Sequence, residues 1–121
     1  MTIMIVDDNA QMRRLIRSFL PEGHQVVECA DGAEALAGYQ KHQPDCVTMD
    51  IKMPVMDGIT ATSRILASFP QARIVMVTEF TSDGLREAAR QAGARHYVLK
   101  EDLSPLGSLI CERANFENSE D

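Results

Sequence analysis

Short apolar runs alternate with longer amphipathic segments along the whole of this 121-residue chain. Unbroken apolar runs are typical of strands that are buried on both faces of a sheet, whereas apolar spacings of three and four residues are typical of helices. The runs that predict strands cover residues 2–6, 25–29, 45–50, 72–78 and 95–100. The segments that follow them predict helices over residues 10–20, 33–41, 57–69, 82–92 and 104–113.

The first predicted helix shows the helical spacing most fully. Its apolar residues recur at intervals of three, four, seven and eight, which predicts that all of them face the core. These residues are Met12, Leu15, Ile16, Phe19 and Leu20. Asn9 stands where an N-cap is needed before this helix, and Gly93 stands where the fourth predicted helix needs a C-terminal glycine.

Strict alternation of strands and helices predicts an α/β protein, with a parallel sheet covered by helices on both faces. The sequence contains no internal linker and no repeat, so we expect one domain over residues 1–121 without an output domain. The acidic residues 114–121 are expected to form a frayed tail.

Composition and charge narrow the class of protein. The chain is 45% hydrophobic and 25% charged, as in globular domains, and its formal net charge is −6. Lysine and arginine do not form a basic stripe, which argues against direct binding to nucleic acid. No apolar run approaches the roughly 18 residues of a membrane span, and no signal peptide precedes the first strand. Together with three widely spaced cysteines, these features predict a cytoplasmic protein with reduced thiols.

Polar residues follow four of the predicted strands at the point where each strand ends. Asp7 and Asp8 follow the first strand, Asp50 ends the third, Thr78 ends the fourth and Lys100 ends the fifth. Because the carboxyl ends of parallel strands share one edge of the sheet, where ligands bind in such folds, we expect these five side chains to meet.

Three neighbouring carboxylates repel one another by about 4 kcal/mol per pair at an effective dielectric constant of about 20. A fold tolerates that repulsion when a cation binds or a proton is taken up. A set of oxygen ligands without histidine or cysteine favours Mg²⁺, and Mn²⁺ also suits it. Lys100 and Thr78 offer a positive charge and a hydroxyl to phosphate oxygens, and Asp50 is the candidate nucleophile.

Five segments of the sequence resemble the receiver domains of two-component response regulators, with CheY-like organisation. They are IVDDNAQMR (5–13), ADGAEAL (30–36), DCVTMDIKMPVMDG (45–58), IVMVT (74–78) and AGARHYVLK (92–100). The resemblance implies a flavodoxin-like doubly wound fold with five helices and strand order 2-1-3-4-5.

The resemblance also implies a role for each site residue. Asp50 would be the phosphorylated aspartate, and Asp7, Asp8, Asp50 and the backbone carbonyl of Lys52 would hold Mg²⁺. Thr78 and Lys100 would contact the phosphoryl group. Tyr97 stands where the family has its switch aromatic, with Thr78 as the other switch residue.

By the same resemblance, the chain would be a signalling phosphoacceptor that catalyses only its own phosphorylation and dephosphorylation. A histidine kinase or a histidine phosphotransfer protein would be the donor. The predicted helix 82–92, strand 95–100 and helix 104–113 would then change shape for a downstream effector or a fused output domain. A phosphorylation-dependent dimer is a further expectation.

Two residues depart from the family pattern. Glu101 follows Lys100 where many members have a proline, so we expect a trans peptide bond there. Glu79 follows Thr78 where the family usually has a small residue. Its carboxylate is expected to hinder the entry of the phosphodonor or to slow attack by water.

Three other functions remain open at this point. A degenerate receiver would use the fold only for contacts with proteins, although all five site residues are present. An aspartate-nucleophile phosphohydrolase also uses acids, threonine and lysine with Mg²⁺, but its nucleophile lies on the first strand. A flavodoxin-like flavin binder needs a hydroxyl-rich loop after the first strand, where this chain has carboxylates.

Overall fold

The computed structural model describes residues 1–110 of the chain. Its strands are β1 (Thr2–Val6), β2 (Gln25–Cys29), β3 (Cys46–Met49), β4 (Ile74–Thr78) and β5 (His96–Leu99). Its helices are α1 (Ala10–Ser18), α2 (Gly32–His42), α3 (Gly58–Ser68) and α4 (Asp83–Ala92), and residues 106–110 are also helical. The end of the fifth predicted helix, Cys111 and the predicted tail 114–121 lie outside the described residues.

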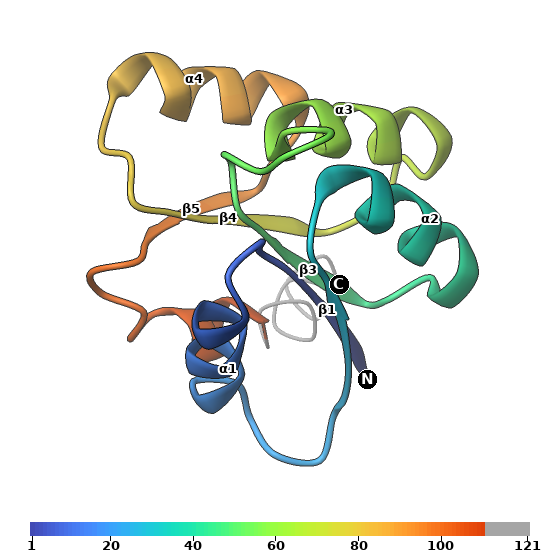
Figure 1. Ribbon diagram of the computed structural model, residues 1–121, viewed down its shortest axis with the longest axis vertical. Helices are drawn as coiled ribbons and strands as arrows, with labels where there is room; N and C mark the ends of the chain where they lie inside the picture. The colour runs from blue at the N-terminus through green and yellow to red at the C-terminus, as the bar shows by residue number, and fades with distance from the viewer. Residues whose placement is uncertain (111–121) are drawn as a thin grey trace, which may run out of the picture.

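The five strands form one parallel sheet in the order β2-β1-β3-β4-β5, which confirms the predicted strand order (Figure 1). Helices α2, α3 and α4 cover one face of this sheet, whereas α1 and residues 106–110 cover the other (Figure 1). Each face has its own apolar core. The first is built around Met4, Met49 and Met76, and the second around Ile3, Ile5 and Val75.

Side-chain caps explain where the four bounded helices begin. The residue before each helix has extended backbone, and its side chain accepts a hydrogen bond from a backbone N–H of the first turn. These N-caps are Asn9, Asp31, Asp57 and Ser82. Gly93, with a φ of 109°, ends α4 in the left-handed conformation, as the sequence predicted.

The predicted inward face of the first helix is partly wrong. Helix α1 ends at Ser18, and Leu15 and Phe19 are 44% and 41% exposed. Ile16 in α1 and Leu20 just beyond its end are buried in the core on this face of the sheet. Leu15 and Phe19 each precede one of these buried residues by one position, which turns their side chains away from the sheet towards solvent.

Among residues 1–110, no helix combines the length and the apolar character that crossing a membrane requires.

Candidate functional site

Strands β1 and β3 bring two of the predicted acids together. They are hydrogen-bonded neighbours, with Val6 in register with Met49. Asp7 and Asp50 are the next residues, and the Asp50 backbone N–H donates to the Val6 carbonyl over 2.9 Å. Both carboxylates therefore emerge at the same edge of the sheet, which is the edge that the sequence predicted.

Asp7, Asp8 and Asp50 form a cluster in which one carboxylate oxygen from each residue lies within 4.8 Å of the others. Asp7 is fully buried and Asp50 is 5% exposed, whereas Asp8 faces solvent. Backbone N–H groups orient the two buried carboxylates. Asn9 donates to Asp7 Oδ1 and Ile51 donates to Asp50 Oδ1, each over 2.9 Å.

Lys100 supplies the positive charge of this cluster. Its Nζ lies 2.9 Å from Asp7 Oδ2 and 3.2 Å from Asp50 Oδ1. Its backbone N–H donates to the Thr78 carbonyl over 2.8 Å, which continues the pairing of β4 with β5 to the site. Burial lowers the pKa of the Lys100 ammonium, but Asp7 and Asp50 outweigh that effect and hold this pKa above its ordinary value. The peptide bond after Lys100 is trans, like every other peptide bond that the structure describes, as expected without proline.

The carboxyl group of Asp50 has a strongly perturbed acidity. Burial, followed by repulsion from the Asp7 carboxylate, raises its pKa to about 6, although Lys100 and the N–H of Ile51 oppose the rise. One lysine therefore does not fully compensate the two buried acids. Within the described part of the chain, Asp7 Oδ2 accepts no hydrogen bond beyond its ion pair with Lys100. A cluster of carboxylate oxygens with charge left to neutralise fits a hard divalent cation such as Mg²⁺.

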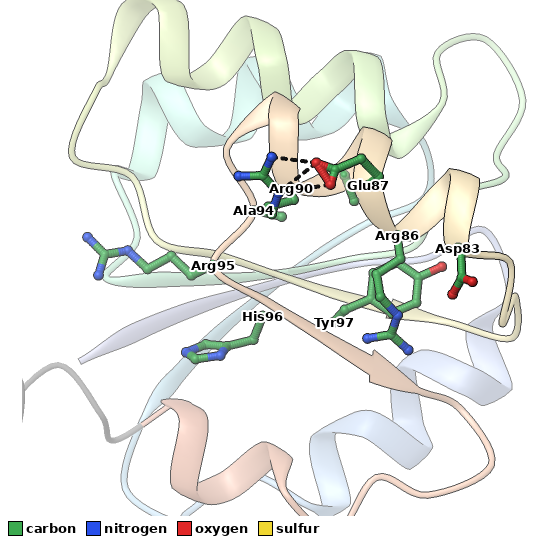
Figure 2. A pocket seen from close by; sticks show the side chains of 9 residues that line it. Asp83, Arg86, Glu87, Arg90, Ala94, Arg95, His96 and Tyr97 are labelled. Atoms are coloured by element: carbon green, nitrogen blue, oxygen red, sulfur yellow. Dashed lines mark hydrogen bonds and ion pairs between the residues drawn. The ribbon is translucent and has the colours of Figure 1, made fainter.

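Thr78 and Tyr97 are linked through the loop that follows β4. The Phe80 backbone N–H donates to Thr78 Oγ1 over 3.2 Å, and the Tyr97 hydroxyl donates to the Phe80 carbonyl over 2.8 Å. The Arg86 guanidinium of α4 lies 4.4 Å from the centre of the Tyr97 ring (Figure 2). Thr78 is buried and Tyr97 is half-buried. The structure thus connects the two predicted switch residues through one residue of backbone.

Lys52 and Glu79 both have exposed side chains at this end of the sheet. The Lys52 ammonium lies 4.9 Å from the centre of the Phe80 ring. The role of the Lys52 carbonyl as a metal ligand and the effect of Glu79 on the donor remain predictions. Sequence reasoning missed Phe80 and Arg86. The only sequence signal for Phe80 was its aromatic side chain two positions after the site threonine Thr78.

Two glycines allow the loop after β3 to pack closely on neighbouring backbone. A Cβ atom on Gly58 would lie 1.8 Å from the Asp50 backbone oxygen, and one on Gly32 would lie 2.3 Å from the Met56 backbone oxygen. The Gly32 N–H donates to that same Met56 oxygen over 3.0 Å. Both glycines thus permit close backbone packing beside the site.

Comparison with known proteins agrees with this geometry. Residues 3–108 match the response regulator receiver domain family. The chemotaxis protein CheY of Bacillus subtilis (strain 168) is 46% identical over 100 residues, which cover 81% of this chain and 83% of that protein. The chain therefore belongs to the response regulator receiver domain family, as the motifs at 5–13 and 45–58 indicated.

Two solved structures show the same architecture. A CheY-like response regulator receiver domain from Methanospirillum hungatei JF-1 is 27% identical with a TM-score of 0.88, and the match covers 99% of this chain and 98% of that one. A chain of the CheX–CheY–BeF3–Mg²⁺ complex from Borrelia burgdorferi is 30% identical with a TM-score of 0.83, and the match covers 93% of this chain and 87% of that one.

Membership of this family settles the broad class of function. Receiver domains of this kind act as signalling proteins, bind Mg²⁺ at an acidic pocket, and interact with histidine kinases and downstream effectors. Neither the flavin binder nor the phosphohydrolase gains support from the family match or from the site. Whether the receiver is phosphorylated or degenerate depends on the chemistry of its own acidic cluster.

Proposed function

We propose that the chain is a phosphoacceptor whose Asp50 receives a phosphoryl group from a histidine kinase or a histidine phosphotransfer protein. The observation that carries the proposal is the position of the Asp50 carboxylate. It is buried, clustered with Asp7 and Asp8, and paired with the Lys100 ammonium. A degenerate receiver would have no need to keep this mutually repelling set of acids together.

The acidic cluster supports Mg²⁺ as the cofactor, and Mn²⁺ would fit the same ligands. Asp7, Asp8, Asp50 and the Lys52 backbone carbonyl would hold the ion. When bound, the ion neutralises the carboxylates and stabilises the negative charge on the phosphoryl oxygens. This charge compensation matters because Lys100 alone leaves the pKa of Asp50 raised to about 6.

The transfer forms one bond and breaks another. A carboxylate oxygen of Asp50 attacks the phosphorus atom, and the bond from phosphorus to the imidazole nitrogen of the donor breaks with its electron pair leaving on that nitrogen. The product is an aspartyl phosphate. The Lys100 ammonium and the Thr78 hydroxyl would then bind two of the phosphoryl oxygens.

The new phosphoryl group would also move the loop that Thr78 and Tyr97 share. Thr78 Oγ1 accepts a hydrogen bond from the Phe80 N–H. Rotation of the Thr78 side chain towards the phosphoryl group would break this hydrogen bond and release Phe80. Tyr97, which is bonded to the Phe80 carbonyl, would follow. Only a higher affinity of the phosphoryl group for the moved state can drive this change.

The surface beside Tyr97 offers a place for a partner to detect the change. Helix α4, β5 and the connection between them line a cavity of about 560 Å³, with Arg86 and Arg90 from α4, Arg95 from the connection and Tyr97 from β5 (Figure 2). A downstream effector, a fused output domain or a second copy of the chain would dock here after phosphorylation. A cavity whose lining includes the switch tyrosine suits a partner that must distinguish the two states.

The phosphoacceptor role is tested by incubating the protein with acetyl phosphate and Mg²⁺ and measuring its intact mass. We expect a gain of one phosphoryl group, with acetate as the leaving group, and no gain when EDTA removes the metal. Asp50→Asn should show no gain because the amide is not nucleophilic. Asp102→Asn, at an exposed aspartate outside the acidic cluster, is the matched control and should be phosphorylated normally. An unchanged mass of the parent protein would instead identify a degenerate receiver.

A further inference from the structure

Lys52 and Phe80 connect two loops at the edge of the site. Lys52 belongs to the loop after β3 and Phe80 to the loop after β4. The Lys52 ammonium lies 4.9 Å from the centre of the Phe80 ring, within the roughly 6 Å over which a cation and an aromatic face attract each other. The side chain of Lys52 is otherwise exposed, so the Phe80 ring is the contact that gives this side chain a defined position.

The loop that carries Lys52 is firmly anchored. The Gly58 N–H donates to the Ile51 carbonyl over 2.7 Å, and the Gly32 N–H donates to the Met56 carbonyl over 3.0 Å. Close packing of Gly58 on the Asp50 backbone adds a steric constraint. Lys52 therefore extends from a fixed platform.

The loop that carries Phe80 is held mainly by that residue. Its neighbours Glu79 and Thr81 are exposed, whereas Phe80 is half-buried. The Phe80 N–H donates to Thr78 Oγ1, its carbonyl accepts from the Tyr97 hydroxyl, and its ring meets the Lys52 ammonium. Both backbone hydrogen bonds of Phe80 are made with the predicted switch residues Thr78 and Tyr97. The contact of its ring with Lys52 is therefore a third restraint on the position of this loop.

We propose that the Lys52 ammonium and the Phe80 ring form a clamp that stabilises the unmodified position of the loop 79–82 and so opposes the switch. The clamp rests on the proposed phosphoacceptor function. When Thr78 turns towards a phosphoryl group, Phe80 can follow only by leaving the Lys52 ammonium. Lys52 and Phe80 are therefore positioning residues. They set the free-energy difference between the two loop positions that binding of the phosphoryl group must overcome.

The clamp predicts a measurable bias in the unmodified protein. A cation–aromatic contact at an exposed site corresponds to a change of about two- to fivefold in an equilibrium constant. Removing it should increase the population of the moved state by that factor. The apparent affinity for beryllofluoride, a phosphoryl mimic, should rise equally while that state remains the minor one.

The test uses 3-fluorotyrosine labelling and ¹⁹F NMR, because the chain has only two tyrosines. Tyr97 reports the switch, and the buried Tyr39 serves as an internal reference. The variants are Lys52→Met, Phe80→Leu and their double variant. Phe80→Leu keeps both backbone hydrogen bonds and all charges. Lys41→Met, at an exposed lysine of α2, is the matched control for loss of a positive charge.

We expect each single variant to move the metal-free Tyr97 signal towards its position in the beryllofluoride complex. Each should also lower the half-saturating beryllofluoride concentration about two- to fivefold in Mg²⁺. The double variant should match Phe80→Leu, because Lys52 acts through the ring. Lys41→Met should match the parent.

Two results would overturn the clamp. One is a Phe80→Leu protein with the parent's Tyr97 signal and affinity. The other is an equal effect of Lys52→Met with and without the Phe80 ring, which would mean that the lysine acts only through its charge on the acidic cluster. A parent protein that binds no beryllofluoride would contradict the proposed function instead. The clamp would then be tested by the metal-free Tyr97 signal alone, which Lys52→Met and Phe80→Leu should shift in the same direction, and a parent-like signal in both variants would overturn it.

Discussion

At the scale of single residues, Asp50 shows how burial prepares a carboxylate for chemistry. It lies beside the fully buried Asp7, and the two acids share the ammonium of Lys100. Burial and Asp7 raise the pKa of Asp50 to about 6, so the group is ionised near neutral pH but is more basic than an ordinary aspartate. A more basic carboxylate is a better nucleophile once a cation offsets its neighbours.

The raised pKa of Asp50 predicts an unusual pH dependence of stability in the metal-free protein. At pH 5 the folded state holds a proton on Asp50, whereas the unfolded state, with an ordinary pKa of about 4, mostly does not. The folded state thus binds more protons, and the free energy of unfolding should rise by about 1 kcal/mol from pH 7 to pH 5 through this group. Urea denaturation in EDTA measures it.

The Asp50→Asn variant is the control for this pH dependence, since it keeps the other titrating groups. Its free energy of unfolding should lack the component that Asp50 contributes. Identical pH profiles for the variant and the parent would show that the pKa of Asp50 is not raised.

At the scale of elements, the sequence predicted the helices and strands well where a local signal existed. The Asn9 cap and the Gly93 end were predicted because the chemistry that starts or ends a helix is local. The exposure of Leu15 and Phe19 was not, because periodicity shows that a helix has an apolar side but not how much of it the sheet covers. The close packing of Gly58 was also missed. Its contact is with the backbone of Asp50, which lies in another part of the fold, and the local sequence around Gly58 does not indicate that contact.

Two glycine substitutions test the packing of the loop after β3. Gly58→Ala would place a methyl group 1.8 Å from the Asp50 backbone oxygen, so the loop must shift. We expect a loss of about 3 kcal/mol or more in the free energy of unfolding. Gly84→Ala is the matched control in the first turn of α4, where a Cβ would lie 3.5 Å from Ser82 Oγ, an ordinary van der Waals contact.

Gly84→Ala should be neutral or stabilising by about 0.5–1 kcal/mol, because alanine favours the helix. Thermal and urea unfolding of both variants give the comparison. A Gly58→Ala protein as stable as the parent would show that the loop and Asp50 are not packed as described.

At the scale of the whole molecule, the site side chains come from the carboxyl ends of four strands, which meet at one edge of the sheet. The meeting of Asp7 and Asp50 followed from the sequence pattern, since parallel strands end at a common edge. The order β2-β1-β3-β4-β5 was implied by the family resemblance. The contacts of Phe80 with Lys52, Thr78 and Tyr97 did not follow. They join loops that are distant in sequence, and no periodicity or spacing records which loop side chains meet.

Binding of Mg²⁺ at that edge should stabilise the entire fold. A ligand that binds only the folded state adds about 2.7 kcal/mol to the free energy of unfolding at a hundredfold excess over its Kd. Thermal unfolding in a Mg²⁺ titration measures this gain, with Ca²⁺-free buffer and EDTA as the reference state. Asp8→Asn, which removes an exposed ligand, should weaken the gain, and it should raise the metal-free melting temperature by reducing acid repulsion. A parent melting temperature that does not respond to Mg²⁺ would contradict the metal site.

The proposed function requires that Asp50 itself carries the phosphoryl group, and the sharpest test is to locate the modification in the chain. The protein is phosphorylated with acetyl phosphate and Mg²⁺ and then treated with borohydride, which reduces an aspartyl phosphate to homoserine. Peptide mass spectrometry then locates the reduced residue. We expect homoserine at position 50 and unreduced aspartate at Asp7 and Asp8. Reduction at another aspartate, with Asp50 intact, would contradict it.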